Sequence, residues 1–379
     1  MTPYAAPSFY HIHVTSVVRR GLLEYLHISK SGGTSFSAAA KHSGCLMAPG
    51  IGQLEALGDL PRWINGTAFE ELTGGTSIMW SYYGSKGRPA QGQSCTGRLA
   101  HLKELGYNYV SNEFTLHGGG GSGGGGGGSR GAEGLHATHV CPGSVNVVTL
   151  RQPDGRLASH LHYMLARVKK RLLGKTDFDT SDFFDTFCTG DVAMWQRVAP
   201  PVVDNYALRS FIGERAFHSP VGGIGSEHVK VARRLLLQFD LVMDLDAGEE
   251  AADLAMRQGL GWNVSLSELH VRTSSQTFAK LHYSKEDCPN EELLRLLLPR
   301  QEPDRQLYST GRTLAFLDGV FLDVAQALGL RPNSLAAGTV PPPARGTGTV
   351  KGSPACGLLN AGATGRRKTA GRKARLMVR

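Results

Sequence analysis

The sequence predicts an α/β fold in three layers, with a central parallel sheet flanked by helices. Two observations carry this prediction. Short apolar runs alternate with longer segments of helical periodicity, which is typical of parallel strands joined by crossover helices. In addition, 41% of the 379 residues are apolar and 19% are charged, the composition of a globular chain with a substantial buried core.

The expected elements follow one another along the chain. We expect strands, from short apolar runs, at Leu22–Ile28, Tyr107–Val110, Val145–Leu150 and Leu241–Leu245. We expect helices, most of them from apolar residues three and four apart, at Thr34–Lys41, Arg156–Leu173, Ser226–Gln238 and Asp304–Leu328. These elements predict one domain over residues 21–330, preceded by an N-terminal extension of residues 1–20.

The formal net charge of +9 is located in the C-terminal tail. Residues 331–379 contain ten Lys or Arg and no Asp or Glu, so residues 1–330 carry a net charge near −1. Because the main domain is not basic, we expect no nucleic-acid partner. The tail is rich in Pro, Gly, Ala and Thr. It is predicted to be disordered, and either solvated or in contact with an acidic surface.

The cysteines and sequons weakly favour a secretory compartment. The six cysteines are widely spaced and include no CxxC pair, so they predict no zinc site and permit disulfides. They are Cys45, Cys95, Cys141, Cys188, Cys288 and Cys356. Glycosylation sequons begin at Asn65 and Asn263. Residues 1–20 lack the apolar stretch of a signal peptide or anchor, and no segment reaches the roughly 18 apolar residues that span a bilayer.

One internal segment cannot contribute to a core. From Gly118 to Ser129 the sequence is almost pure glycine. Glycine offers no side chain to bury and disfavours regular structure. We therefore predict a flexible insertion in a surface loop over residues 118–133, with no chemical role.

The most informative segment is Leu26–Phe36, which reads LHISKSGGTSF. An apolar strand ends at Ser29, a turn with two glycines follows, and a helix begins at Thr34 or Ser35. The N–H groups of such a turn and of a helix N-terminus form a cradle for phosphate, and Lys30 adds a positive charge. The residues expected to bind the phosphate are Lys30, Ser31, Gly32, Gly33, Thr34 and Ser35.

The order of residues in this loop distinguishes two kinds of enzyme. In nucleoside triphosphatases the lysine follows the last glycine, whereas Lys30 precedes both glycines. This order resembles the loop of sulfotransferases that use 3′-phosphoadenosine 5′-phosphosulfate (PAPS), especially the heparan sulfate 2-O- and 6-O-sulfotransferases. Their loop reads Lys-Thr-Gly-Gly-Thr after a strand bearing histidine, and Ser31 keeps the hydroxyl of that threonine. The resemblance implies a P-loop-like fold.

A second segment strengthens the resemblance. In Val147–Ser159 a strand ends at Arg151, proline breaks the chain, and a helix carries Ser159 eight residues later. This pattern is similar to the family's site for the 3′-phosphate of PAPS, although Gln152 replaces the usual aspartate. An arginine offers a fork of donors to a phosphate, so the resemblance assigns Arg151 and Ser159 to cofactor binding.

Two weaker matches lie further along the chain. Asn205–Arg209 is similar to the family's Asn-x-x-x-Arg stretch near the cofactor and acceptor. Asp304–Tyr308 resembles the Asp-x-x-Leu-Tyr opening of the last helix, where packing is the expected role. The resemblance therefore covers about residues 22–330, in the order of the family's motifs.

The general base is the most open assignment. The chemistry needs a group that takes the acceptor's proton, and sulfotransferases use His or Glu for this step. Glu113 follows an expected strand and would face the cleft, so we expect it to be the base, with Lys30 as the other catalytic residue. His117 and His101 are alternatives, but His117 borders the glycine run and is expected to be mobile.

The resemblance implies sulfuryl transfer from PAPS to a carbohydrate hydroxyl, without a metal, in the Golgi lumen or at the Golgi membrane. The acceptor would be a glycan, with an acidic polysaccharide as one option. A P-loop kinase or NTPase remains an alternative, with Asp244 or Asp246 as the magnesium ligand. A non-catalytic relative that binds nucleotide or glycan is the third reading.

Overall fold

The computed structural model describes most of the chain. The described residues are 5–48, 62–75, 81–83, 94–118, 135–172, 187–188, 191–266, 268–269, 274–286, 288, 291–332 and 356–360. Residues 119–134, which include most of the predicted insertion, lie outside this part, as do tail residues 333–355 and 361–379.

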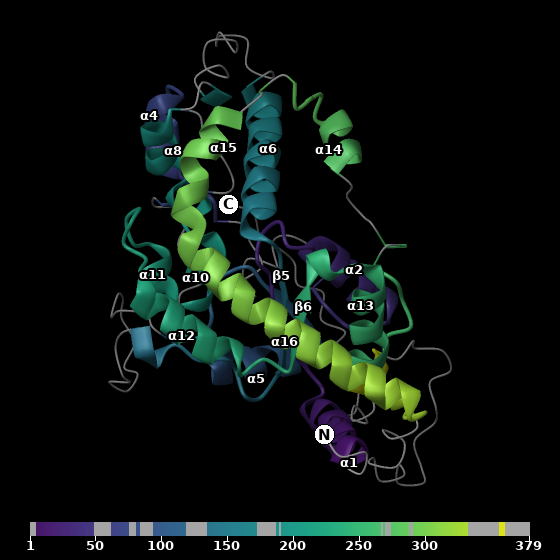
Figure 1. Ribbon diagram of the computed structural model, residues 1–379. Helices are drawn as coiled ribbons and strands as arrows, with labels where there is room; N and C mark the ends of the chain where they lie inside the picture. The colour runs from purple at the N-terminus through teal and green to yellow at the C-terminus, as the bar shows by residue number, and fades with distance from the viewer. Residues whose placement is uncertain are drawn as a thin grey trace, which may run out of the picture.

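A four-stranded parallel sheet forms the centre of the molecule (Figure 1) and confirms the predicted α/β class. Its strands, in spatial order, are β4 (Tyr109–Asn112), β1 (Leu23–Leu26), β5 (Val145–Leu150) and β6 (Leu241–Asp244). A separate pair consists of β2 (Ile64–Asn65) and β3 (Ser81–Tyr83).

Strand β4 differs from its prediction, beginning two residues later and extending to Asn112. Tyr107 still belongs to the turn after the preceding helix, because its N–H donates to the carbonyl of Leu102. The polar Ser111 and Asn112 are buried in the strand. Asn112 donates to the buried carboxylate of Glu24, an interaction that hydrophobic patterning does not predict.

The sheet is buried on both faces, as expected for parallel strands. On β5, Val145 and Val147 pack into one hydrophobic cluster, whereas Val148 and Leu150 pack into another. Each cluster is completed by helices. The alternation explains why the strands are nearly continuous apolar runs.

Helices account for most of the remaining structure (Figure 1). The α-helices of the described residues are α1 (Ala5–Arg20), α2 (Gly33–His42), α4 (Gly66–Leu72), α5 (Cys95–Leu105), α6 (Pro153–Leu172), α8 (Val192–Val198), α9 (Pro200–Val203), α10 (Tyr206–Phe211), α11 (Glu214–Phe217), α12 (Ser226–Leu236), α13 (Glu249–Leu254), α14 (Ser274–Lys280), α15 (Glu291–Leu297) and α16 (Glu302–Ala327). Shorter 3₁₀ turns are η1 (Leu135–Ala137), η2 (Leu245–Ala247), η4 (Leu298–Gln301) and η5 (Gly357–Asn360), and η3 (Ala255–Gly259) is a π-helical turn.

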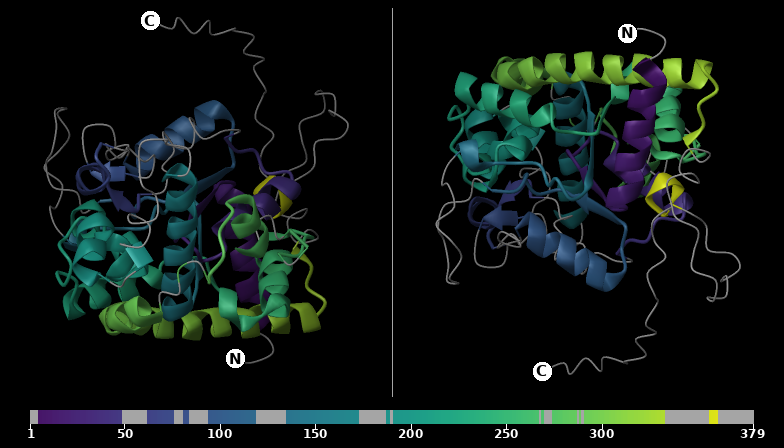
Figure 2. Two further views of the ribbon diagram at one scale, coloured as in Figure 1. Left: turned by 90° about the horizontal axis from the view of Figure 1, so that it is seen from above. Right: turned by 90° about the horizontal axis from the view of Figure 1, so that it is seen from below.

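The long helix α16 lies along one side of the molecule, and α5 lies on the opposite side with the sheet between them (Figure 2). A glycine permits the close approach of α16 to the sheet. A Cβ atom at Gly311 would come within 2.0 Å of the Leu150 side chain on β5. Any larger residue would require the Leu150 side chain or α16 to move.

Both ends of the described chain are packed into the fold. The expected extension, residues 1–20, is largely helix α1, whose buried Tyr10, Val14 and Val17 join the core. Near the other end, Leu358 and Leu359 are fully buried in the same cluster. The prediction of a disordered tail is therefore wrong for residues 356–360.

All six cysteines form disulfides, which join Cys45 to Cys356, Cys95 to Cys141 and Cys188 to Cys288. The first bond attaches η5 to the segment that follows α2. It thereby fixes residues near the C-terminus next to the helix that begins at the predicted phosphate loop.

The glycine-rich insertion begins and ends at a paired stem. His117 and His139 form an antiparallel bridge, and the N–H of His139 donates to the carbonyl of His117 over 2.8 Å. The described residues on the two sides of the insertion thus lie next to each other. None of the helices in the described part of the chain has the length and apolar content needed to span a bilayer.

Candidate functional site

The carboxyl ends of the parallel strands bring the predicted site residues together. Leu26, the last residue of β1, pairs with Asn112 of β4 and Val148 of β5. The segments after these strands, which include Glu113 and Arg151, therefore lie along one edge of the sheet. Ligands of α/β proteins bind at this edge.

The predicted phosphate loop lies between β1 and α2. Two of its residues have left-handed backbone conformations, Lys30 with φ 70° and Gly32 with φ 84°. Helix α2 begins at Gly33, and no side chain among the described residues caps it. Its first N–H groups lack acceptors within the helix, so they can bind an anion.

Two further features fit the loop to an anion. The hydroxyl oxygen of Ser31 is buried and has no hydrogen-bond partner among the described residues, although buried hydroxyls are normally paired. Thr34 and Ser35 are partly exposed in the first turn of α2. A ligand with acceptor oxygens would satisfy this set of donors.

Gly33 must be glycine for a local reason. A Cβ atom there would come within 2.0 Å of the His27 imidazole ring. His27 follows β1 directly, so its ring packs against the start of α2. The histidine that precedes the loop therefore shapes it, a role not assigned from the sequence.

Arg151 lies against the loop, as its position after β5 predicts. Its guanidinium donates to the carbonyl oxygen of Lys30 over 3.1 Å. The Lys30 ammonium lies 4.2 Å from the centre of the Tyr163 ring on α6. Ser159, also on α6, is partly exposed. Loop, Arg151 and α6 thus form one positively charged region.

Glu113 is buried next to the loop. Its Oε1 accepts a 2.5 Å hydrogen bond from Ser29 and lies 4.0 Å from Nε2 of His27. Ser29 Oγ also lies 2.9 Å from the indole nitrogen of Trp63 and 3.1 Å from the hydroxyl of Tyr206. The contact between Glu113 and Ser29, and their contacts with His27, Trp63 and Tyr206, were not predicted from the sequence.

A second buried group extends the region along α6. The Arg156 guanidinium lies 3.3 Å from Nδ1 of His160 and 3.9 Å from the Asp304 carboxylate. Burial, with the charges of Arg156 and Lys30, lowers the pKa of His160 well below its usual value, so the ring is neutral. Nε2 of His160 has no hydrogen-bond partner among the described residues. His160 was not predicted as a site residue, although it directly follows Ser159 in the sequence.

The alternative bases are placed differently from Glu113. His117 is buried, contrary to the expectation of a mobile residue, and its Nε2 lies 3.1 Å from both carboxylate oxygens of Glu24. Burial alone would raise the pKa of Glu24, but Arg98 and His117 lower it to about 2. His101 lies on α5 and is partly exposed.

Glu24 and His117 also belong to a cluster of potential metal ligands. Among the described residues, Glu24, His117 and Cys141 bring their potential ligand atoms within 4.8 Å of one another. Cys141, however, is bonded to Cys95 and cannot supply a thiolate. Glu24 already accepts from Arg98 over 2.6 Å, so the donor set does not fit a metal ion.

The weaker motifs contribute to the fold. The Asn205 amide donates to Asp204 and accepts from the N–H of Asp304, and Arg209 is buried among backbone carbonyls. Asp304 accepts from the N–H groups at the start of α10, which supports its expected packing role. The Asn205–Arg209 motif therefore organises α10, and its Tyr206 places a hydroxyl 3.1 Å from Oγ of Ser29 in the turn after β1.

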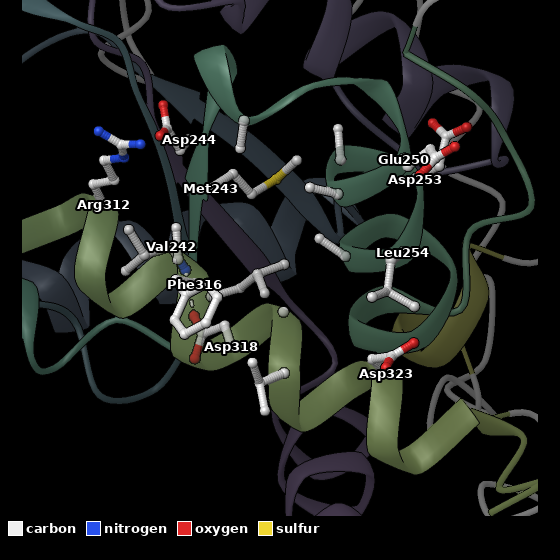
Figure 3. Close-up of a pocket in the computed structure, with 18 of the residues that line it drawn as sticks. Val242, Met243, Asp244, Glu250, Asp253, Leu254, Arg312, Phe316, Asp318 and Asp323 are labelled. Carbon is white, nitrogen blue, oxygen red and sulfur yellow. Dashed lines mark hydrogen bonds between the residues drawn. The ribbon is translucent and has the colours of Figure 1, made fainter. Parts of the chain in front are cut away.

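A groove of about 1270 Å³ extends between α13 and α16 (Figure 3). Gln152 lines its loop end, and Met243 of β6 lies on its floor. Asp244 and Asp318 are among the carboxylates around it. Burial raises the pKa of Asp318 to about 6, and this carboxylate accepts a hydrogen bond from the N–H of Val242.

The chain was compared with protein-family models, with curated proteins and with solved structures, and none of the three comparisons found a match.

Proposed function

We propose that the protein is a sulfotransferase with a P-loop-like fold, which transfers a sulfuryl group from PAPS to a carbohydrate hydroxyl. The observation that carries the proposal is the contact between Arg151 and the carbonyl of Lys30. It brings the two sequence segments that resemble the sulfotransferase family, 121 residues apart, to one edge of the sheet. Each segment alone is a short motif, whereas together they form a site for two phosphate groups.

The residues of this edge fit the chemistry of PAPS. The N-terminus of α2, with Thr34 and Ser35, would hold the 5′-phosphosulfate, and the buried Ser31 hydroxyl would gain the partner it lacks. Arg151 and Ser159 would bind the 3′-phosphate, which distinguishes PAPS from ATP.

The reaction forms one bond and breaks another. The acceptor hydroxyl oxygen bonds to sulfur while the bond from sulfur to the bridging phosphate oxygen breaks, and 3′-phosphoadenosine 5′-phosphate leaves with the electron pair. Lys30 would stabilise the charge on the leaving oxygen. Glu113 would take the hydroxyl proton, since its carboxylate lies beside the loop, 2.5 Å from Oγ of Ser29, the residue before Lys30.

Charge limits where an acceptor could bind. The groove between α13 and α16 is rimmed by Asp244, Glu250, Asp253 and Asp323. Like charges across an interface disfavour binding, so a polyanionic acceptor would not occupy this groove. An acidic polysaccharide would have to approach Glu113 from another side.

The kinase or NTPase alternative is less well supported. Its candidate magnesium ligands are engaged, because Asp244 accepts from the Tyr308 hydroxyl and Asp246 accepts from the N–H of Gln152. A Golgi lumen is part of the proposal, and the three disulfides support it because such bonds persist in oxidising compartments.

Titration calorimetry with 3′-phosphoadenosine 5′-phosphate and with ATP, followed by a transfer assay with ³⁵S-labelled PAPS and a panel of glycans, tests the proposal. We expect tighter binding of 3′-phosphoadenosine 5′-phosphate and transfer of label to at least one glycan. Preference for ATP would overturn the proposal in favour of a kinase. Binding without transfer to any glycan would support the non-catalytic reading.

A further inference from the structure

Ser29 is the centre of a buried hydrogen-bond network, of which Trp63 and Tyr206 have no part in the mechanism above. Its Oγ lies 2.5 Å from Oε1 of Glu113, 2.9 Å from Nε1 of Trp63 and 3.1 Å from the Tyr206 hydroxyl. The side chains of Ser29, Trp63, Glu113 and Tyr206 are all buried. A serine hydroxyl has one hydrogen to donate and two lone pairs, so three partners use its full capacity.

The direction of each hydrogen bond follows from the chemistry of the partners. The indole of Trp63 can only donate, and an ionised carboxylate can only accept. Ser29 must therefore accept from Trp63 and give its single hydrogen to Glu113. Because only one lone pair of Ser29 then remains, the Tyr206 hydroxyl must be a donor to it. The hydrogen bonds from Tyr206 and Trp63 converge on Ser29 and continue to Glu113.

This order is consistent with an ionised carboxylate. Donors that polarise Ser29 strengthen its own bond to Glu113. If Oε1 of Glu113 were protonated, it would donate to Ser29, as Trp63 and Tyr206 do. Three donors would then compete for two lone pairs, unless Ser29 donated its own hydrogen to Tyr206. Hydrogen bonds to the charged form of a carboxyl group lower its pKa, whereas burial raises it.

We propose that Ser29 is a positioning residue, through which Tyr206 and Trp63 hold Glu113 ionised and oriented beside the phosphate loop. The inference deepens the proposed function, on which its catalytic consequence rests. Ser29 precedes Lys30 directly. The residue that aims the base is therefore adjacent, along the chain, to the residue that stabilises the leaving group.

The charged and titratable groups around the network are compatible with this role. His27 lies 4.0 Å from Glu113, and the guanidinium of Arg62 lies 4.3 Å from the centre of the Phe114 ring, next to Glu113 in the chain. Arg156 lies 5.2 Å from the Tyr206 ring. Burial, then the charge of Glu113, raises the pKa of Tyr206 to about 12, so its hydroxyl remains a donor at neutral pH.

The first test measures the carboxyl group itself and needs no activity. The pKa of Glu113 is followed by carbon NMR in protein labelled at glutamate carboxyl carbons, with Glu113→Gln to assign the resonance. We expect Ser29→Ala to raise this pKa by at least about 1 unit, and Tyr206→Phe to raise it less. Ser210→Ala is the matched control. This buried serine lies on α10 beside Tyr206, and its hydroxyl donates to the Tyr206 carbonyl.

The second test measures the consequence for sulfuryl transfer. With less of Glu113 ionised, the acid limb of the pH dependence of kcat should move to higher pH in Ser29→Ala, with KM for PAPS within about twofold of the parent. Ser29→Thr keeps a hydroxyl and should restore the profile. If Ser29→Ala does not fold, Tyr206→Phe carries both measurements.

The outcomes separate the two proposals. An unchanged Glu113 pKa and an unchanged kcat profile in the folded variants would overturn the positioning role. A raised Glu113 pKa in a protein that neither binds 3′-phosphoadenosine 5′-phosphate nor transfers sulfuryl groups would support the network and reject the sulfotransferase proposal.

Discussion

The Arg151 guanidinium holds the carbonyl oxygen of Lys30 at 3.1 Å, so the end of β5 is tied directly to the loop after β1. The residue proposed to bind one phosphate thus also supports the backbone of the loop proposed to bind the other. Because Lys30 has a left-handed backbone conformation, this support acts where the chain is least favourable for a residue with a side chain.

Replacing Arg151 by Ala should weaken binding of 3′-phosphoadenosine 5′-phosphate by about 1.5–3 kcal/mol, the range for a hydrogen bond to a charged group. Ser159→Ala should cost less, because its hydroxyl is a neutral donor. Adenosine 5′-phosphosulfate has no 3′-phosphate and should lose little affinity in either variant. Calorimetric titration of each variant with both ligands measures these changes in affinity. Equal weakening of both would mean that Arg151 acts only on the loop. Arg305→Ala, which removes a partly exposed arginine paired with Asp154, is the control.

Removing the charge of Lys30 should raise the barrier to sulfuryl transfer by about 2.7–4 kcal/mol, as for the loss of an oxyanion donor. Glycine is the informative substitution, because it adopts a φ of 70° without strain whereas alanine does not. Lys30→Gly should therefore melt near the parent temperature while losing most transfer of ³⁵S label. Activity within a few-fold of the parent would exclude Lys30 from the chemistry.

The partly buried carboxylate of Asp318 predicts a specific pH dependence of stability. Its pKa in the folded protein, about 6, lies above its ordinary value because burial penalises the charged form. The free energy of unfolding should therefore fall as pH rises from about 4 through 6. Asp318→Asn can keep the hydrogen bond to Val242 and should stabilise the protein at pH 7 by on the order of 1–2 kcal/mol, with no gain at pH 4. Denaturant unfolding between pH 4 and 8 measures this, with exposed Asp323→Asn as control. A gain that is the same at both pH values would show another cause.

The disulfide between Cys45 and Cys356 should contribute about 2–5 kcal/mol to the free energy of unfolding. Replacing both residues by Ser should lower the melting temperature and expose η5 to proteolysis near Leu358. Peptide mapping of the unreduced protein should find all six cysteines in the three pairs described above. Free thiols, or other pairs, in protein from an oxidising host would contradict the fold at these positions.

Deleting residues 119–134 and closing the gap with two polar residues should change the melting temperature by no more than a few degrees. The ends of the insertion are already paired at His117 and His139, and loop length has a small entropic effect. A matched deletion that also removes both histidines should destabilise the protein, because it removes the bridge and the contact of His117 with Glu24. A large loss from the shorter deletion would show that the insertion packs against the domain.

The sheet was predictable where local sequence determined it. Val145–Leu150 is a buried apolar strand that ends at Arg151, and the structure has the predicted bounds. Strand β4 was displaced because Ser111 and Asn112 are polar, and their burial depends on partners such as Glu24, far away in the chain. Helix α1 was not predicted, because Tyr, His, Ser and Thr interrupt the apolar positions of residues 5–20.

In the candidate site, too, the residues in local motifs were predictable and those joined only by distant contacts were not. Lys30 and Arg151 could be brought together from the sequence, since both follow strands and belong to ordered motifs. Ser29 and its partners could not. Trp63 and Tyr206 are 34 and 177 residues from Ser29, and no local pattern indicates that they meet. Their convergence results from tertiary packing, which brings the residue before β2 and the start of α10 against the turn after β1.

The paired stem at His117 and His139 has a consequence for the engineering of this chain. An exchange confined to residues 119–134 would leave the bridge in place, whereas residues 135–138 must be kept, because Leu135 packs against the core and Thr138 donates to the carbonyl of Ile212. A folded guest domain whose own termini are close together could replace the glycine run. The host would then carry a reporter or a second binding module at a fixed attachment point.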